Sequence, residues 1–243
     1  MRTDNSWFAS RAETTWKVSP GRSFLLIVPH GSDDLQSARL IATWAMENIR
    51  LPQHCQNHRP VIVWITTDEA TSSRHFVRKL GRKLSDGVQG GLAFEEEEYP
   101  SDELEGIISV ANAAGVYPVV LIERFHAFAK VADEHLLSVL SALRTLEHSG
   151  QITTLALTPV PYDAIRRQLA LEGAFPFVNS AYGDNHERAV MTPISRAEFV
   201  AAAVTRGIKQ DFANRIFSLA GGPDVVFRAG LANLNRTLSG VFA

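Results

Sequence analysis

Short apolar runs alternate along the chain with longer stretches of helical periodicity. Four runs have the length of a buried strand, at residues 24–28, 61–66, 117–122 and 152–157. The stretches between them repeat apolar residues every three or four positions, which is typical of a helix with one packed face. This alternation predicts an α/β fold, with a doubly wound, mostly parallel sheet between helices. The clearest helix spans residues 133–149 before Gly150, and one face carries Leu136, Leu140, Leu143 and Leu146.

Less regular elements fill the remainder of this region. Either Asp68 or Thr71 is expected to cap a helix that runs through Leu84, because both side chains accept hydrogen bonds from free N–H groups. The pattern further predicts short strands at 92–94 and 189–191, helices at 102–114 and 163–171, and an aromatic loop at 175–185.

The C-terminal part has a purely helical pattern. Ser195-x-x-Glu198 is a capping box, which starts a helix by satisfying two free N–H groups. Apolar residues at helical spacing then predict two further helices, one with Phe212, Ile216 and Leu219 and one with Phe227, Leu231, Leu234 and Leu238. We therefore expect an N-terminal arm at 1–22, an α/β domain at 23–192 and a helical, lid-like subdomain at 193–243.

The N-terminal arm is polar apart from Trp7, Phe8 and Trp16. It is either disordered or docked on the body. Docking is favoured, because three exposed large aromatic side chains would form an adhesive apolar patch.

Composition limits the possible settings of the protein. The net charge of −2 argues against a broad nucleic-acid surface, and Cys55 is the one cysteine, so no disulfide forms within the chain. Residues 1–22 lack the apolar core of a signal peptide, and no run reaches the roughly 18 apolar residues of a membrane span. These features predict a cytoplasmic protein without a membrane partner.

The loop after the first strand has the position of a phosphate-binding loop without its chemistry. A Walker A motif needs two glycines, a lysine for the phosphates and a hydroxyl for Mg²⁺. This chain places Asp34, Leu35 and Gln36 at the positions of the second glycine, the lysine and the hydroxyl. Asp33 and Asp34 suit the N-terminus of a helix, but at about 4 Å each would repel a phosphate charge by on the order of 4 kcal/mol near a protein surface.

In their order along the chain, several segments resemble the AAA+ and STAND branch of P-loop ATPases. They are 29–36, 119–124, 152–158 and the helical region 195–239, together with Phe175-Pro176-Phe177-Val178-Asn179 and Leu219-Ala220-Gly221-Gly222-Pro223. The resemblance spans residues 20–240 and implies a P-loop NTPase-like sheet with a helical lid.

The resemblance assigns a vestigial nucleotide site. A Walker B strand ends in Asp-Glu, whereas Val119-Val120-Leu121-Ile122 is followed by Glu123 and Arg124. Glu123 could still hold a hydrated Mg²⁺, but Arg124 cannot accept a proton. Thr158 matches the sensor-1 polar residue. The remaining residues of the site are those of the loop, His30, Gly31, Ser32, Asp33 and Asp34.

Two arginines and two segments at strand ends predict an interaction surface. Arg166 and Arg167 lie where an arginine finger would serve a neighbouring subunit, although both also suit a solvated helix surface. Because ligand sites of parallel sheets lie at the carboxyl ends of the strands, residues 29–34, 123–126 and 166–167 should share one edge. We expect a protein–protein interface there.

Other candidate chemistry is weaker. His54 and His58 flank Cys55, but a metal site draws three or four ligands at clear spacing, and no second cluster exists. The four acids at 95–98 are expected to be solvated. His30 in the opening loop is the histidine with the most functional interest, although a structural role is the simpler interpretation.

Three functions fit these residues. The first is a non-catalytic AAA+/STAND-like module that binds a protein partner, a copy of itself or an active ATPase, and needs no cofactor. The second is a divergent NTPase that binds ATP and Mg²⁺. The third is an accessory of a DNA-processing ATPase that contacts DNA through a basic helix face, namely Arg74, Arg78, Lys79, Arg82 and Lys83.

Overall fold

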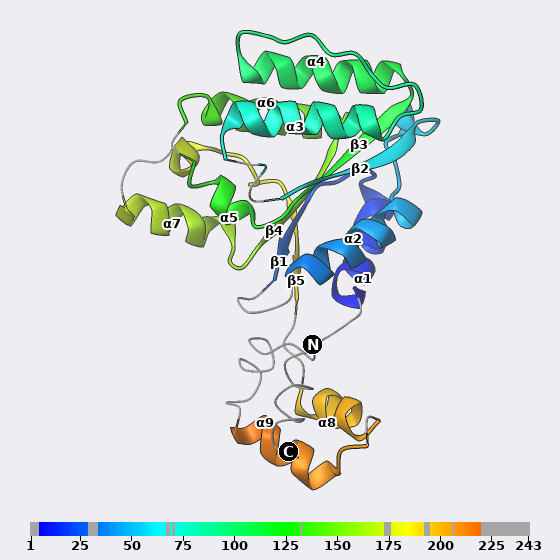
Figure 1. The fold of residues 1–243 in the computed structure, drawn as a ribbon, viewed down its shortest axis with the longest axis vertical. Coiled ribbons are helices and arrows are strands. Elements are labelled where there is room, and N and C mark those ends of the chain that lie inside the picture. The colour runs from blue at the N-terminus through cyan, green and yellow to red at the C-terminus, as the bar shows by residue number, and fades with distance from the viewer. Residues whose placement is uncertain are drawn as a thin grey trace.

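The computed structural model describes residues 5–28, 34–66, 69, 71–131, 133–172, 176–191, 195–205 and 207–219. Its centre is a five-stranded sheet of order β2-β3-β4-β1-β5 in which every neighbouring pair is parallel. The strands are β1 (Phe24–Ile27), β2 (Arg59–Ile65), β3 (Val116–Ile122), β4 (Thr153–Thr158) and β5 (Glu187–Val190). The predicted parallel α/β fold is confirmed (Figure 1).

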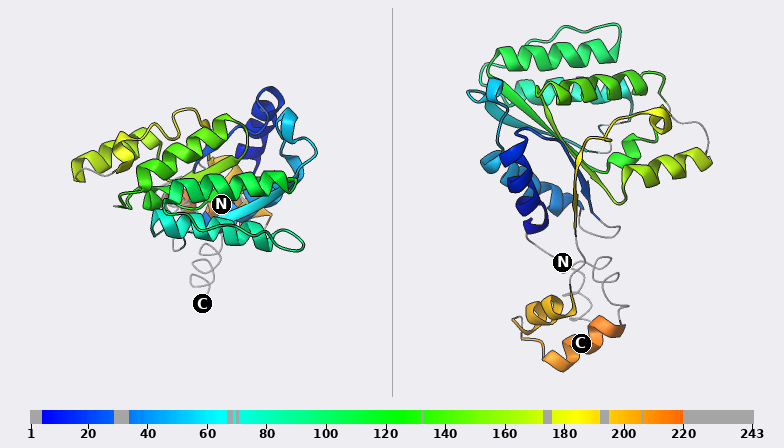
Figure 2. Two further views of the ribbon diagram at one scale, coloured as in Figure 1. Left: turned by 90° about the horizontal axis from the view of Figure 1, so that it is seen from above. Right: turned by 180° about the vertical axis from the view of Figure 1, so that it is seen from behind.

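Helices cover both faces of the sheet. One face packs against α3 (Ser73–Asp86), α4 (Pro100–Ala113) and α6 (Leu136–His148), with α5 (Phe125–Phe128) and α7 (Tyr162–Glu172) near its end. The other face packs against α1 (Ser6–Val18) and α2 (Asp34–Asn48) (Figure 2). Because β3 and β4 are covered on both sides, every one of their residues is buried, which explains their continuous apolar runs. Two short 3₁₀ helices, η1 (Gln53–Cys55) and η3 (Pro176–Asn179), complete the α/β part.

The N-terminal arm is a docked helix. Phe8 and Trp16 are fully buried, and the Trp16 indole N–H donates to the Arg22 carbonyl at 2.9 Å. Phe8, Ala12 and Trp16 are spaced four residues apart and share the buried face of α1. Docking was therefore the correct alternative, whereas the helix itself was not predicted, because Ala12 makes the apolar stripe inconspicuous.

Some predicted element ends were wrong. The cap of α3 is Ser72, whose side chain accepts from the His75 N–H, and is not Thr71; Asp68 lies outside the described residues. Helix α6 starts at Leu136, because the Asp133 carboxylate instead accepts from the N–H groups of Ser73 and His135.

Residues 92–94 form no strand. The Ser85 hydroxyl binds both the N–H and the carbonyl of Leu92, at 2.8 and 3.0 Å, and so holds this segment against α3, away from the sheet. The fifth strand also lies earlier than predicted, at Glu187–Val190, where it pairs with β1.

Helices α8 (Arg196–Val204) and α9 (Gln210–Leu219) pack on each other beyond the sheet (Figures 1 and 2). The capping box is confirmed, since the Ser195 hydroxyl and the Glu198 carboxylate each accept from the other residue's N–H. Phe199, Ala213 and Phe217 form a small apolar cluster of their own. The last predicted helix and the segment 221–223 lie outside the described residues, and the proposed domain boundaries remain predictions. No helix in the described part has the length and apolarity needed to span a bilayer.

Candidate functional site

The carboxyl ends of β1, β3 and β4 meet at one edge of the sheet. Ile27 pairs with Thr158, and Ile122 pairs with Ala156. The Val28 N–H extends the pairing by donating to the Thr158 carbonyl at 2.8 Å. The ends of these three strands therefore lie side by side, at the edge where parallel sheets bind ligands.

The predicted phosphate loop lies mostly outside the described residues. This applies to His30, Gly31, Ser32 and Asp33, whereas Asp34 is the first residue of α2 and its side chain is not described. Leu35 stands in the first turn of α2 with 46% of its surface exposed. Leu35 is the residue that the sequence alignment predicts at the position of the Walker A lysine.

Glu123 follows β3 directly. Its N–H donates to the Ile65 carbonyl at 2.9 Å, and its carboxylate accepts from the Trp64 indole N–H at 3.1 Å. Both partners belong to β2, so the neighbouring strand fixes the Glu123 carboxylate at the edge. A carboxylate in this position is the feature that would suit a hydrated Mg²⁺.

Arg124 is the unusual residue of this edge. Its backbone is left-handed, with φ 53° and ψ 49°, and it is the one non-glycine with positive φ in the described ranges. Such a conformation costs about 1–3 kcal/mol and is found preferentially at functional sites. Arg124 is exposed and lines a hollow of about 10 Å³ with Val28, Leu157, Thr158 and Pro159. A guanidinium, which cannot take up a proton, therefore directly follows the Glu123 carboxylate.

Thr158 is buried at the end of β4. Its hydroxyl donates to the Val160 carbonyl at 3.0 Å and lies 3.4 Å from the Val160 N–H. The side chain thus closes the turn that leads toward α7.

The two arginines of α7 have different roles. The Arg166 guanidinium donates to the Asp184 carboxylate at 2.7 Å and to the Tyr182 carbonyl at 2.8 Å, and lies 5.4 Å from the centre of the Phe177 ring. Its side chain is 18% exposed, so it is a clamp within the chain. Because these contacts occupy the guanidinium within the chain, they argue against the expectation that Arg166 serves an interface. Arg167 is exposed and makes one hydrogen bond, to the Asp163 carbonyl in its own helix.

A buried aromatic cluster supports this edge. The Phe125 ring lies 5.0 Å from Tyr162, 5.4 Å from Phe177 and 5.6 Å from Tyr182, measured between ring centres. Burial raises the pKa of the Tyr162 and Tyr182 hydroxyls well above the usual value, so both stay protonated. The cluster joins α5, α7 and η3. The aromatic content of 175–185 was visible in the sequence, but its partner Phe125 was not.

The basic face of α3 is largely matched by acids. Arg74 donates to the carbonyls of Glu97 and Glu98, and Arg78 pairs with the Glu96 carboxylate at 2.7 Å. Both arginines also approach the buried Glu103 carboxylate, at 3.6 and 3.8 Å. All four acids at 95–98 are exposed, as expected. The Glu96 carboxylate and the backbone carbonyls of Glu97 and Glu98 additionally bind arginines of α3.

Two lysines of the same helix meet a further acid. Lys79 and Lys83 contact the Glu69 carboxylate at 3.3 and 2.6 Å. Burial alone would raise the pKa of Glu69, but hydrogen bonds from Lys83 and from the Thr66 N–H outweigh it and lower the pKa to about 2. Of the five basic side chains, Arg82 stays exposed without a described partner. These pairings weaken the case for a DNA contact through α3.

The residues of the candidate metal loop separate in space. Cys55 is buried, and its burial raises the pKa of the thiol. The His58 ring nitrogen Nε2 lies 2.9 Å from the Asn112 carbonyl. His54 instead lines a hollow together with residues 19–23. Within the described ranges, no three His, Cys, Asp or Glu side chains are grouped as metal ligands.

A family comparison identifies the fold class more narrowly. The family model described as Novel STAND NTPase 2 matches residues 57–243, which is more than half of the chain. The chain belongs to this family. The matched region includes β3 with Glu123 and Arg124, β4 with Thr158, and α7. No curated protein matches.

Solved structures support the same architecture. The ADP form of the ORC2 protein of Aeropyrum pernix aligns with a TM-score of 0.58 at 10% identity, over 99% of this chain and 65% of that one. The Walker-type ATPase of Pyrococcus abyssi aligns with a TM-score of 0.55 at 10% identity, over 91% of this chain and 64% of that one. The chain thus spans somewhat less than two thirds of these relatives, and at such identity the likeness concerns the fold alone. The chain is an ATPase-fold module of the STAND and AAA+ kind.

Proposed function

We propose that this STAND family member is a non-catalytic ATPase-fold module that works by protein–protein interaction, either with a copy of itself or with an active ATPase. The observation that carries the proposal is Arg124, which has a left-handed backbone and directly follows Glu123 at the end of β3. A hydrolytic site needs a group there that polarises water, and arginine stays protonated at all relevant pH values. Leu35 at the lysine position supports the same conclusion.

Turnover is the direct test of the non-catalytic part. We expect no release of phosphate from ATP with Mg²⁺ above the rate of a Glu123→Gln variant, because no base is available. Glu105→Gln, an exposed carboxylate on α4, is the matched control. Turnover that Glu123→Gln abolishes and Glu105→Gln preserves would establish the alternative of a divergent ATP-binding NTPase.

The partner surface that we propose is the carboxyl edge of the sheet. It presents the exposed Arg124 and Arg167 side chains and the half-exposed Leu35. Because Arg166 is engaged within the chain, Arg167 is the arginine of α7 that is available to a partner.

Assembly can be measured by light scattering over a concentration series. For self-association, Arg167→Glu should weaken the assembly by about 1 kcal/mol, roughly fivefold, whereas Arg215→Glu on α9 should leave it unchanged. A concentration-independent monomer would exclude the self-associating form and leave a foreign partner. An assembly that responds equally to both variants would contradict the choice of this edge.

A further inference from the structure

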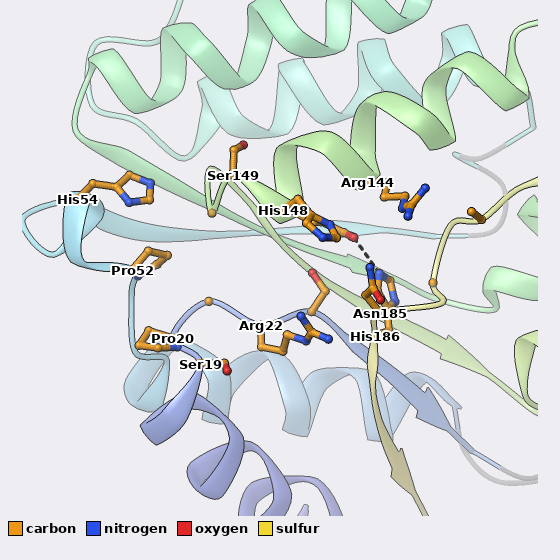
Figure 3. A pocket seen from close by; sticks show the side chains of 16 residues that line it. Ser19, Pro20, Arg22, Pro52, His54, Arg144, His148, Ser149, Asn185 and His186 are labelled. Atoms are coloured by element: carbon orange, nitrogen blue, oxygen red, sulfur yellow. Dashed lines mark hydrogen bonds and ion pairs between the residues drawn. The ribbon is translucent and has the colours of Figure 1, made fainter.

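A second hollow opens at the amino-terminal edge of the sheet, opposite the candidate nucleotide edge. Its volume is about 270 Å³ (Figure 3). Three segments that lead into strands bound it: 19–23 before β1, 147–150 before β4 and 181–186 before β5. Pro52 and His54 close one side. None of the residues assigned to the carboxyl edge lines this hollow.

Close backbone packing fixes the walls of the hollow. Gly183 has φ +84°, and a Cβ atom there would lie 1.7 Å from the Tyr162 ring. Gly21 has φ +73°, and a Cβ atom would lie 2.7 Å from the Tyr117 hydroxyl. Only glycine fits at both positions, so the segment before β5 packs directly on Tyr162 and the segment before β1 packs directly on Tyr117 and Pro52.

Two arginines against one carboxylate, Glu147, give the lining of the hollow an excess of positive charge. Arg22 comes from the segment before β1 and Arg144 from α6, and neither guanidinium group has a hydrogen-bond or ion-pair partner among the described residues. His54 and His148 lie on the same lining (Figure 3). The guanidinium groups are therefore free to bind a ligand.

The acid of the lining is hydrogen-bonded to buried side chains. The Glu147 carboxylate lies 2.8 Å from the His186 ring nitrogen Nε2 and 3.2 Å from the Tyr182 hydroxyl. Tyr162 completes the network through the other His186 nitrogen at 3.3 Å. Glu147 and His186 are 9% and 3% exposed, so this carboxylate is held by buried partners, whereas the Arg22 and Arg144 side chains are exposed.

We infer that this hollow binds a small anion bearing a phosphate or carboxylate group. Arg22 and Arg144 hold the anionic group through charge-assisted hydrogen bonds, and the Asn185 amide, which lines the same hollow, orients it (Figure 3). The volume lies just below the usual range for ligand pockets, about 300–1,000 Å³, which favours a small acid or a monophosphate over a nucleoside triphosphate. This site is independent of the proposed function, because the two lie at opposite edges of the sheet.

Calorimetric titration of the full chain with inorganic phosphate, and separately with succinate, tests the inference. We expect saturable binding of at least one anion, and the two titrations distinguish a phosphate site from a carboxylate site. Arg22→Gln and Arg144→Gln should each weaken binding by about tenfold, since each removes one charged donor.

Arg215→Gln is the matched control, an exposed arginine on α9 that should bind like wild type. The unfolding temperatures of all variants verify that the fold is kept. The inference is overturned if neither anion binds saturably, or if Arg22→Gln or Arg144→Gln binds as tightly as wild type. The latter result would also follow from phosphate bound at the carboxyl edge.

Discussion

Arg124 joins a strained backbone to a side chain that cannot act as a base. Its left-handed conformation suits glycine better than any residue with a Cβ atom, by about 1–2 kcal/mol. The backbone conformation therefore does not explain why this residue is an arginine, and we infer that the side chain has a role.

The strain predicts an unusual stability order. Arg124→Gly should unfold with a free energy about 1 kcal/mol higher than Arg124→Ala, as measured by urea denaturation. The same pair at Arg82, an exposed position within α3, should show the opposite order, because glycine is about 1 kcal/mol worse than alanine inside a helix. If the alanine variant were the more stable one at both positions, the left-handed conformation of Arg124 would be contradicted.

Arg166 is predicted to act within the fold. Arg166→Gln should lower the free energy of unfolding by about 1–2 kcal/mol, because it leaves Asp184 and the Tyr182 carbonyl without their charged donor. Arg167→Gln should change it by less than about 0.5 kcal/mol. Denaturant titration of both variants measures the difference, and similar values would mean that Arg166 is an ordinary surface residue.

Glu69 makes stability depend on acid pH. Its pKa is about 2 in the folded chain against an ordinary 4.5, so its contribution is complete above pH 4.5 and is lost as the pH falls through 2. Glu69→Gln should therefore lose less stability than wild type between about pH 5 and pH 2.5. Glu105→Gln, on exposed surface, should keep the wild-type dependence. Parallel curves for wild type and Glu69→Gln would rule out the proposed coupling to Lys83.

At the scale of elements, α1 is an integral part of the sheet's packing. Trp16 stacks on Trp44 with ring centres 5.8 Å apart and meets Phe24 edge to face at 5.7 Å. Arg11 and Glu187 form an ion pair that links α1 to β5.

Removing the Trp16 side chain, which holds α1 on the sheet, should destabilise the protein. Trp16→Ala should lower the free energy of unfolding by about 3–5 kcal/mol, the usual cost of emptying a buried aromatic site. Val18→Ala, at a position that is 82% exposed, should be close to neutral. Thermal or urea unfolding distinguishes the two. A small effect of Trp16→Ala would indicate that α1 detaches at little cost.

The sequence predicts the elements whose burial is simplest. Strands β1, β3 and β4 lie inside the sheet and are buried throughout, so their continuous apolar runs were sufficient to locate them. Strand β2 lies at one edge with every second residue of Val61–Ile65 buried, but its run is also continuously apolar. Strand β5 is an edge strand of mixed polarity, and its bounds were displaced. The segment 92–94 was misassigned because its apolar residues pack on α3 through the Ser85 contact, which no local pattern reveals.

At the scale of the whole molecule, the order of motifs was sufficient to predict that Glu123 and Thr158 lie at one edge, because parallel strands align their carboxyl ends. The role of Arg166 was not predictable, since its partners Tyr182 and Asp184 come from a separate loop. The basic hollow at the opposite edge depends on three segments brought together only by the fold, so no sequence spacing indicates it.

The central claim is that the ATPase fold is kept without nucleotide chemistry. Calorimetric titration of the full chain with ATP and Mg²⁺ tests it most directly. If Leu35 stands at the position of the phosphate-binding lysine and Arg124 at that of the base, as we propose, no saturable binding is expected at micromolar ATP. Micromolar affinity that requires Mg²⁺ and is weakened in Glu123→Gln would contradict the account.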